Sequence, residues 1–283
     1  MTFRSDTSAV PSIVLNDGNL IPQLGFGVFQ VPPENTVEVV TAALKSGYRA
    51  IDTAAIYGNE EGVGRAIRAF GLPRDEVHVT TKLWNSEQGY DSTLKAFDAS
   101  LARLGLDHVD LYLIHWPVAR AGRFVDTFRA FQELQRQGRV GSIGVSNFTV
   151  DNLRTLIAET GTIPAVNQIE LHPAFAQREL RRFHADNAIA TQAWAPLGQG
   201  TALDDPVIVR IAEQLGRTPA QVIIRWHLQS GTIVIPKSVT PARIESNFDV
   251  FGFELDEEQM TAIDGLDRGQ RIGGDPETFG LGL

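Results

Sequence analysis

Residues 48–60, Tyr48-Arg49-Ala50-Ile51-Asp52-Thr53-Ala54-Ala55-Ile56-Tyr57-Gly58-Asn59-Glu60, lead from a strand-like run through a short loop into a helix. The apolar run ends in the acid Asp52, and the loop presents Tyr57. Asn59 opens the helix, and the negative charge of Glu60 is favourable at the positive, N-terminal end of the helix dipole. In the ordinary interpretation Asp52 caps the loop and Tyr57 packs as a half-buried aromatic. A carboxylate at the end of a buried strand equally predicts a functional site.

Two later stretches favour the functional interpretation, because each is an apolar run that ends in one ionisable residue. Val79–Asn85 contains Lys82, and Leu111–Pro117 contains His115. Counting Leu24–Val28, strand-like runs recur at Ala50–Asp52, Val77–Lys82, Val109–His115, Val140–Ser146, Ala165–Glu170, Ala190–Trp194 and Ile233–Pro236. Helical patterns fill the intervals, at Glu34–Ser46, Glu61–Phe70, Ser92–Leu104, Asp126–Gln137, Val150–Thr160, Arg178–Asn187 and Pro219–Gln229.

About eight strand–helix units predict a closed (β/α)8 TIM barrel, an α/β fold. A β-hairpin over Ser12–Pro22 precedes the first unit as an N-terminal plug, and Pro206–Leu215 adds an extra helix before the last strand. No linker or composition break divides the chain. We therefore expect residues 1–283 to form a single barrel domain.

Composition narrows the possible partners and compartments. The formal net charge is -9, and there is no basic run, which argues against binding to nucleic acid or anionic membrane. There is no cysteine, so disulfides and thiolate metal sites are excluded. No apolar stretch is long enough for a membrane span, and Met1–Val10 lacks the apolar core of a signal peptide. We expect a cytoplasmic protein.

In a barrel of this type, the chemistry lies at the carboxyl ends of the strands. Polar or aromatic residues end nearly every apolar run: Asp52, Lys82, His115, Ser146 with Asn147, Gln168 with Glu170, Trp194, and Lys237 with Ser238. Each of them alone has an ordinary structural explanation, such as a salt bridge that closes the barrel top. Together they predict an active site.

Lys82 beside Asp52 predicts a desolvated ion pair that Tyr57 can approach. A cation about 4 Å from the phenol, at an effective dielectric constant of about 20, contributes roughly 4 kcal/mol, or about three pKa units. Asp52 offsets part of this effect. We expect a net lowering of the Tyr57 pKa that makes the phenol a usable acid, with His115 holding a substrate oxygen and sharing proton transfer.

A cluster that polarises a carbonyl needs a nucleophile. The histidines lack metal-binding spacings, so we expect no metal, and Gly144-Val145-Ser146-Asn147-Phe148 lacks the second glycine of a serine elbow. A hydride from a bound cofactor remains. The usual dinucleotide glycine signature is absent, which leaves the barrel rim as the place for a nicotinamide cofactor.

Several rim residues have suitable chemistry for such a cofactor, although each is also compatible with an ordinary core or surface role. Amide and hydroxyl groups suit a carboxamide, and a flat indole suits a nicotinamide ring. A glycine-rich loop suits a pyrophosphate, and cations at a helix start suit a ribose 2′-phosphate. The candidates, in that order, are Ser146, Asn147 and Gln168; Trp194; Pro196, Leu197, Gly198, Gln199 and Gly200; and Lys237, Ser238 and Arg243.

Over nearly its full length the chain resembles the aldo-keto reductase family. The resemblance is carried by the hairpin and by the motifs at 24–27, 51–60, 81–84, 113–117, 144–148, 167–170, 196–198 and 235–238. Residues 193–200 are most similar to the bacterial branch that includes 2,5-diketo-D-gluconate reductases.

The resemblance implies a catalytic tetrad of Asp52, Tyr57, Lys82 and His115, with Tyr57 as the general acid in carbonyl reduction. It also implies NADPH extended across the barrel mouth, with NADH as the less favoured cofactor. The residues at cofactor-binding positions are Gly27, Val28, Asp52, Ser146, Asn147, Gln168, Trp194, Pro196 to Gly200, Lys237, Ser238, Val239, Thr240, Arg243 and Asn247. Thr240 and Ser246 differ from the residues that the branch often has near the 2′-phosphate and adenine.

Phe29, Tyr57, Trp84, His115 and Trp116 are expected to line the substrate pocket, on account of their positions just after strand ends. The tail from Gly269 to Leu283 is a candidate cover for it. The expected activity is NADPH-dependent reduction of aldehydes and ketones, with diketo sugar acids as one substrate class, by a monomer. Two alternatives stay open: a cofactor-binding regulatory protein with negligible turnover, and a metal-dependent hydrolase.

Overall fold

The computed structural model describes residues 10–280, so the expectations for residues 1–9 and for the last three tail residues lie outside the described part. Within it, eight parallel strands follow one another around the sheet in chain order. They are β3 Phe26–Gly27, β4 Ala50–Asp52, β5 His78–Leu83, β6 Val109–Ile114, β7 Val140–Ser146, β8 Val166–Glu170, β9 Ala190–Trp194 and β10 Ile233–Val234. A parallel bridge between Leu24 and Val234 joins the first and last strands, and the predicted barrel is confirmed.

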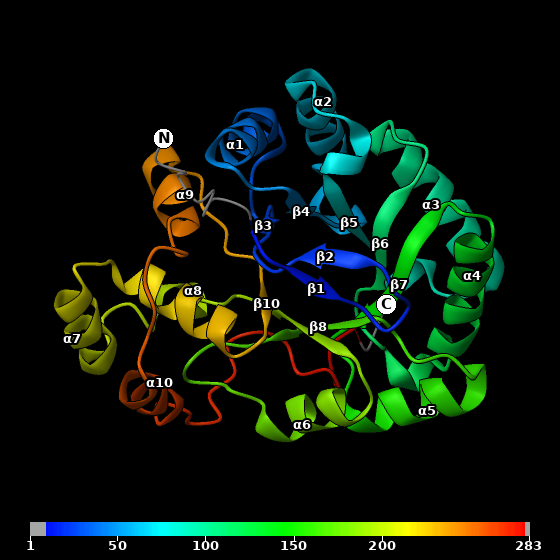
Figure 1. The fold of residues 1–283 in the computed structure, drawn as a ribbon. Helices are drawn as coiled ribbons and strands as arrows, with labels where there is room; N and C mark the ends of the chain where they lie inside the picture. The colour runs from blue at the N-terminus through cyan, green and yellow to red at the C-terminus, as the bar shows by residue number, and fades with distance from the viewer. Residues whose placement is uncertain (1–9, 281–283) are drawn as a thin grey trace.

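Helices surround the sheet (Figure 1). They are α1 Pro33–Ser46, α2 Glu60–Phe70, α3 Tyr90–Leu104, α4 Phe124–Arg136, α5 Val150–Thr160, α6 Arg178–Asp186, α7 Pro206–Leu215, α8 Pro219–Gln229, α9 Pro241–Phe248 and α10 Glu257–Asp264. The predicted extra helix is α7. No prediction covered α10, whose capping box of Asp256 and Gln259 marks its start.

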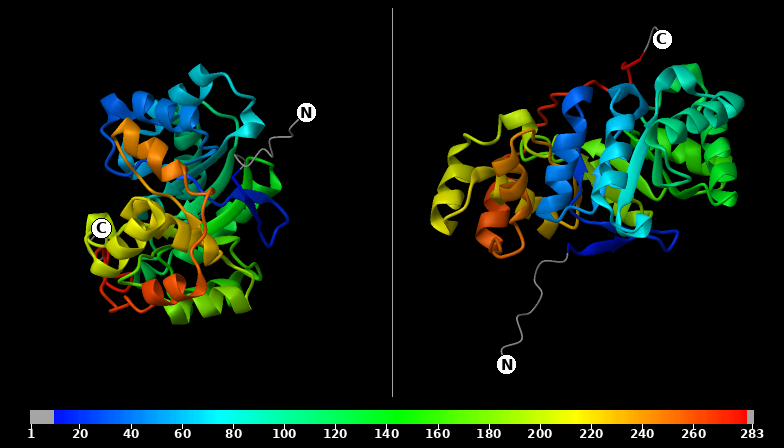
Figure 2. Two further views of the ribbon diagram at one scale, coloured as in Figure 1. Left: turned by 60° about the vertical axis from the view of Figure 1, so that its left-hand side comes forward. Right: turned by 90° about the horizontal axis from the view of Figure 1, so that it is seen from above.

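The N-terminal hairpin closes the bottom of the barrel. Its strands, β1 Ser12–Val14 and β2 Leu20–Pro22, pair antiparallel. Leu15 and Ile21 pack against inward-facing side chains of β6, Leu111 and Leu113, in one buried cluster. Figure 2 shows the hairpin at one end of the barrel and the C-terminal segment at the other. The bottom of the barrel is therefore filled with side chains, which leaves the opposite end for ligands.

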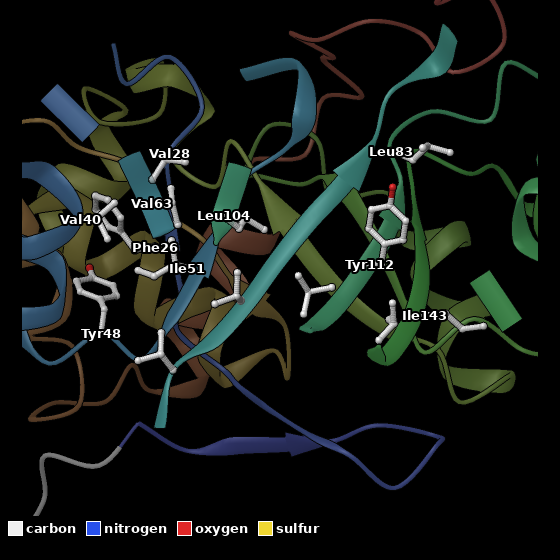
Figure 3. Close-up of a cluster of buried hydrophobic side chains, with 14 of the residues drawn as sticks. Phe26, Val28, Val40, Tyr48, Ile51, Val63, Leu83, Leu104, Tyr112 and Ile143 are labelled. Atoms are coloured by element: carbon white, nitrogen blue, oxygen red, sulfur yellow. The ribbon is translucent and has the colours of Figure 1, made fainter. Parts of the chain in front are cut away.

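A second apolar layer lies between the sheet and the helices, and Figure 3 shows part of it. Its packing is close enough to require glycine where α2 meets α3. A Cβ on Gly64 would lie 1.7 Å from the carbonyl oxygen of Leu104. This layer fixes the helices against the strands, and so fixes the loops that carry the polar strand ends.

Strand register aligns those strand ends. Gly27 pairs with Asp52, Asp52 with Thr80, and Ser146 with Gln168 across neighbouring strands. The residues that end the apolar runs therefore gather at one end of the barrel, away from the hairpin. None of the helices within residues 10–280 has both the length and the apolar character needed to cross a membrane.

Candidate active site

A buried ammonium group lies at the centre of the strand ends. Lys82 has no exposed side-chain surface. Its Nζ donates three hydrogen bonds: to Asp52 Oδ1 at 2.5 Å, to the carbonyl oxygen of Thr53 at 2.9 Å, and to the Tyr57 hydroxyl at 3.3 Å. All three N–H donors of the ammonium are thus used. Because the Tyr57 oxygen accepts from Lys82, its own proton is free to be donated elsewhere.

The Asp52 carboxylate is held from both sides. Its Oδ2 accepts a hydrogen bond from Gln168 Nε2 at 2.7 Å, and the same nitrogen lies 2.8 Å from Gln192 Oε1. Burial lowers the pKa of Lys82, but Asp52 and Tyr57 together raise it above its usual value. Lys82 is therefore charged at neutral pH, as the predicted ion pair requires.

The expected lowering of the Tyr57 pKa is wrong for this structure. Burial raises the pKa of Tyr57, and this effect outweighs the lowering by the Lys82 ammonium, while Asp52 adds a further increase. The sequence estimate counted the charges but not the desolvation of the phenol. Tyr57 is consequently protonated at neutral pH, and Lys82 limits the energetic cost of its ionisation without removing it.

His115 is neutral at neutral pH. Burial, helped by the nearby Lys82 ammonium, lowers its pKa well below 6.5. Its ring meets the rings of Tyr57 and Trp84 edge-on, with centroids 5.6 Å and 5.3 Å away. Nδ1 is buried and has no hydrogen-bond partner within residues 10–280. A neutral imidazole here can donate or accept one hydrogen bond, but it does not add a second positive charge.

The loop that carries Tyr57 is braced by residues whose roles the sequence analysis missed. Asn59 is at the N-cap of α2, but its side chain makes no capping bond. It donates instead to the carbonyl oxygens of Val28 and Val31 and accepts from the Thr53 hydroxyl. Glu60 is buried as well, between the Thr81 hydroxyl and Arg103. In the sequence, the only indication of a role for Asn59 and Glu60 was their place in the motif of residues 48–60.

The five predicted pocket residues, which include Tyr57 and His115 of the tetrad, lie close to one another. Phe29 is 52% exposed and lies against Tyr57, with ring centroids 5.0 Å apart. The aromatic contacts continue through His115 to Trp84. Trp116 is connected to them by Phe279, which stacks on it at 4.1 Å and meets the Trp84 ring edge-on at 6.4 Å. Phe279 belongs to the tail and was not predicted individually.

The three residues predicted for a carboxamide are adjacent but already bonded to one another. Asn147 Nδ2 donates to the carbonyl oxygen of His115 and to Ser146 Oγ. Asn147 Oδ1 accepts from the Trp194 indole at 2.8 Å, which fixes the orientation of the ring. Ser146 Oγ in turn donates to the carbonyl oxygen of Gln168. A ligand would have to share or exchange these bonds.

The remaining predicted cofactor residues lie along the rim. Gly198, Gln199 and Gly200 all have positive φ, in a 3-10 turn that follows Pro196 and Leu197. Lys237, Val239, Thr240 and Arg243 are exposed around the start of α9. Ser238 is buried just before the helix, and Asn247 is buried near its end. Gly27 ends β3 beside Asp52, and Val28 follows it, with its N–H donating to the carbonyl oxygen of Asp52. Residues 10–280 contain no cluster of three His, Asp or Glu side chains that could hold a metal ion.

Comparisons with known proteins match this arrangement. The model of the aldo/keto reductase family matches residues 23–268. The chain belongs to the aldo/keto reductase family. An aldo-keto reductase of Mycolicibacterium smegmatis is 63% identical over 269 residues, covering 95% of this chain and 98% of that protein. Methylglyoxal reductase DkgA of Yersinia pestis is 53% identical, covering 95% and 98%.

Solved structures show the same fold for the family. An aldo/keto reductase from Brucella melitensis has a TM-score of 0.90 and 58% identity, covering 92% of this chain and 99% of that one. A mutant of Gox0644 solved in complex with NADPH has a TM-score of 0.92 and 53% identity, covering 95% and 98%. Family membership makes this chain an oxidoreductase of the aldo/keto reductase class.

Proposed function

We propose that the chain reduces small aldehydes and ketones to alcohols with NADPH, and that Tyr57 supplies the proton. The observation that carries the proposal is the contact of 3.3 Å between the Lys82 ammonium and the Tyr57 oxygen, in a site where Asp52 neutralises the lysine. A buried ion pair is weak evidence of stability, because apolar packing often serves as well. Its position beside a free phenol proton favours a chemical role.

In this mechanism the substrate carbonyl lies between Tyr57 and neutral His115, and one N–H of His115 orients the oxygen. When NADPH is bound, it supplies the hydride that the carbonyl carbon accepts. Tyr57 donates its hydroxyl proton to the carbonyl oxygen as negative charge develops there. The tyrosinate that forms is stabilised by Lys82. Hydride and proton together convert the carbonyl to an alcohol.

The residues of the rim fit this cofactor. The start of α9 has no side-chain cap, and Pro241 at its first position has no N–H. The N–H of Arg243 donates to the carbonyl oxygen of Thr240, so among the described residues the N–H of Ala242 is the one left in the first turn for an anion. Within residues 10–280 neither Lys237 nor Arg243 forms an ion pair, so both charges are available to an anionic ligand. Two unpaired cations at a helix start favour a 2′-phosphate, and hence NADPH over NADH. Trp194 would face the nicotinamide.

The lining of the pocket supports a proposal for the substrate class. It is aromatic, and the relative from Yersinia pestis is named a methylglyoxal reductase. A small, uncharged dicarbonyl or an aromatic aldehyde suits such a wall better than a sugar acid does. The single domain over residues 1–283, the monomeric state and the cytoplasmic location stay predictions.

The test is an assay of NADPH oxidation with methylglyoxal and a panel of aldehydes, in which the loss of NADPH absorbance is monitored. Tyr57→Phe should abolish turnover and leave NADPH affinity nearly unchanged, because only the proton donor is lost. Substantial activity in this variant would contradict the mechanism. Tight NADPH binding by the wild type without turnover of any substrate would instead support the regulatory alternative.

A further inference from the structure

The last described residues, 271–280, form a strap across the barrel mouth. Figure 2 shows this segment at the end of the barrel opposite the hairpin. The strap begins beside an upstream anchor, where the N–H groups of Arg268 and Gln270 donate to the carbonyl oxygen of Ala174. It ends with Phe279 stacked on Trp116. The strap thus runs from the β8–α6 loop to the aromatic wall of the pocket.

Between these two points, one carboxylate holds the strap. Glu170 ends β8 and is 1% exposed. Its Oε1 accepts the N–H of Ile272 at 2.6 Å, and its Oε2 accepts the N–H of Gly273 at 2.8 Å. Within residues 10–280, no other side chain outside the strap hydrogen-bonds to it. His172 Nε2 lies 3.0 Å from Oε1 and holds the carboxylate in place.

The strap is fitted to its position by two consecutive glycines. A Cβ on Gly273 would lie 2.3 Å from the Trp194 ring and 2.9 Å from Glu170 Oε2. A Cβ on Gly274 would lie 2.4 Å from the Phe279 ring. The backbone therefore passes directly over Trp194 and turns so that Phe279 can reach Trp116. Phe279 can stack on Trp116 only when the strap lies in this position.

We propose that Glu170 is a positioning residue that fixes the strap across the mouth and thereby makes Phe279 a wall of the substrate pocket. The inference rests on the proposed function, since it assigns a determinant of substrate size to the same site. Glu170 does not contact the reacting atoms in this scheme. It acts through Ile272 and Gly273 on the position of Phe279.

The first test needs no catalysis. Trypsin cleaves after arginine, and the bond after Arg271 leads into Ile272, whose N–H Glu170 holds. In Glu170→Gln, one acceptor oxygen becomes an NH2 group, so one strap N–H loses its partner. We expect cleavage after Arg271, followed by mass spectrometry, to be faster by about tenfold, the effect of losing one charge-assisted hydrogen bond. An unchanged rate would overturn the proposal.

The matched control is Glu277→Gln. Glu277 lies in the same strap, and its carboxylate makes no hydrogen bond within the described residues. This variant removes the same charge at the same end of the barrel, and it should be cleaved like the wild type. Equal acceleration in both variants would mean that charge alone controls the strap, which would refute a specific role for Glu170.

The second test measures selectivity in the full chain with NADPH. For an aromatic aldehyde such as benzaldehyde, Glu170→Gln should raise KM by roughly three- to tenfold, as expected for the loss of one aromatic contact. The KM for methylglyoxal and both kcat values should change less than about twofold. In a chain truncated after Gln270, Glu170→Gln should have no further effect, because the strap it positions is gone.

Two results would overturn the proposal, because each would mean that Glu170 acts elsewhere. One is an effect of Glu170→Gln that persists in the truncated chain, and the other is a fall in NADPH affinity that matches the rise in KM.

Gly273→Ala gives an independent route to the same result. Its Cβ must displace the strap from Trp194, so it should reproduce both the faster cleavage and the raised KM. If the proposed reduction itself fails, the cleavage test still decides the role of Glu170.

Discussion

Replacing Lys82 by methionine tests the electrostatic basis of the site most directly. The ammonium lies 3.3 Å from the Tyr57 oxygen. At an effective dielectric constant of about 20, a tyrosinate at that distance is stabilised by about 5 kcal/mol. Asp52 cancels part of this, so we take roughly 4 kcal/mol as the loss of transition-state stabilisation. Lys82→Met should then lower kcat about a thousandfold.

The same substitution leaves Asp52 buried without its cation, and breaking a buried pair in this way typically costs about 3–5 kcal/mol of stability. Thermal unfolding should therefore accompany the kinetics. The double variant Asp52→Asn with Lys82→Met removes both charges and should recover much of the stability, while kcat stays low. This pair of variants separates a folding defect from a chemical one.

The assay is steady-state NADPH oxidation, together with the NADPH dissociation constant of each variant. We expect the dissociation constant to change by less than about threefold, since Lys82 is assigned to the proton donor. If Lys82→Met keeps more than about a tenth of the wild-type kcat while folded, the ammonium is not what stabilises the tyrosinate. The mechanism would then need another source of positive charge.

Lys237→Ala should weaken NADPH binding about tenfold and leave NADH binding unchanged, because only NADPH carries the 2′-phosphate; fluorescence titration with both cofactors checks this. Burial lowers the pKa of His184 and His227 to about 3. The unfolded chain binds these protons first, near pH 6.5, so the contribution to stability is present above that pH and is lost as pH falls toward about 3. At about pH 5 we expect the free energy of unfolding to be lower than at about pH 7 by about 2 kcal/mol per histidine. Urea unfolding measures this, and a free energy of unfolding that stays constant over this range would contradict the expectation. Gly64→Ala usually stabilises a helix, but here its Cβ would meet the Leu104 carbonyl oxygen, so thermal unfolding should show a loss of about 3 kcal/mol.

The barrel could be predicted because each strand carries a local signal. The apolar runs that became β4, β7 and β9 ended at the residues where the structure ends them: Asp52, Ser146 and Trp194. A parallel barrel brings its carboxyl strand ends together whatever the loops do, so the clustering of Asp52, Lys82 and His115 followed from the count of units. The approach of Tyr57 to Lys82 followed from the shortness of one loop.

What the sequence did not reveal depends on contacts between distant segments. The pKa of Tyr57 depends on how deeply neighbouring elements bury it, and no pattern along the chain measures that. The role of Glu170 depends on N–H groups about a hundred residues later, at Ile272 and Gly273. Asn59 looked like an N-cap because capping residues are defined locally, whereas its side chain bonds the loop after β3, at Val28 and Val31, and Thr53 of its own loop. Phe279 lies in a tail with no periodicity to place it.

The two ends of the described chain have unequal freedom for protein engineering. Figure 2 shows the N-terminal hairpin at the closed end of the barrel and the C-terminal segment at the open end, where Phe279 stacks on Trp116. A fusion partner or immobilising linker at the N-terminal side would leave access to the pocket intact. The same addition at the C-terminal side would crowd the entrance and pull on the segment beside it. For this reductase, the choice of attachment point is itself a choice about catalysis.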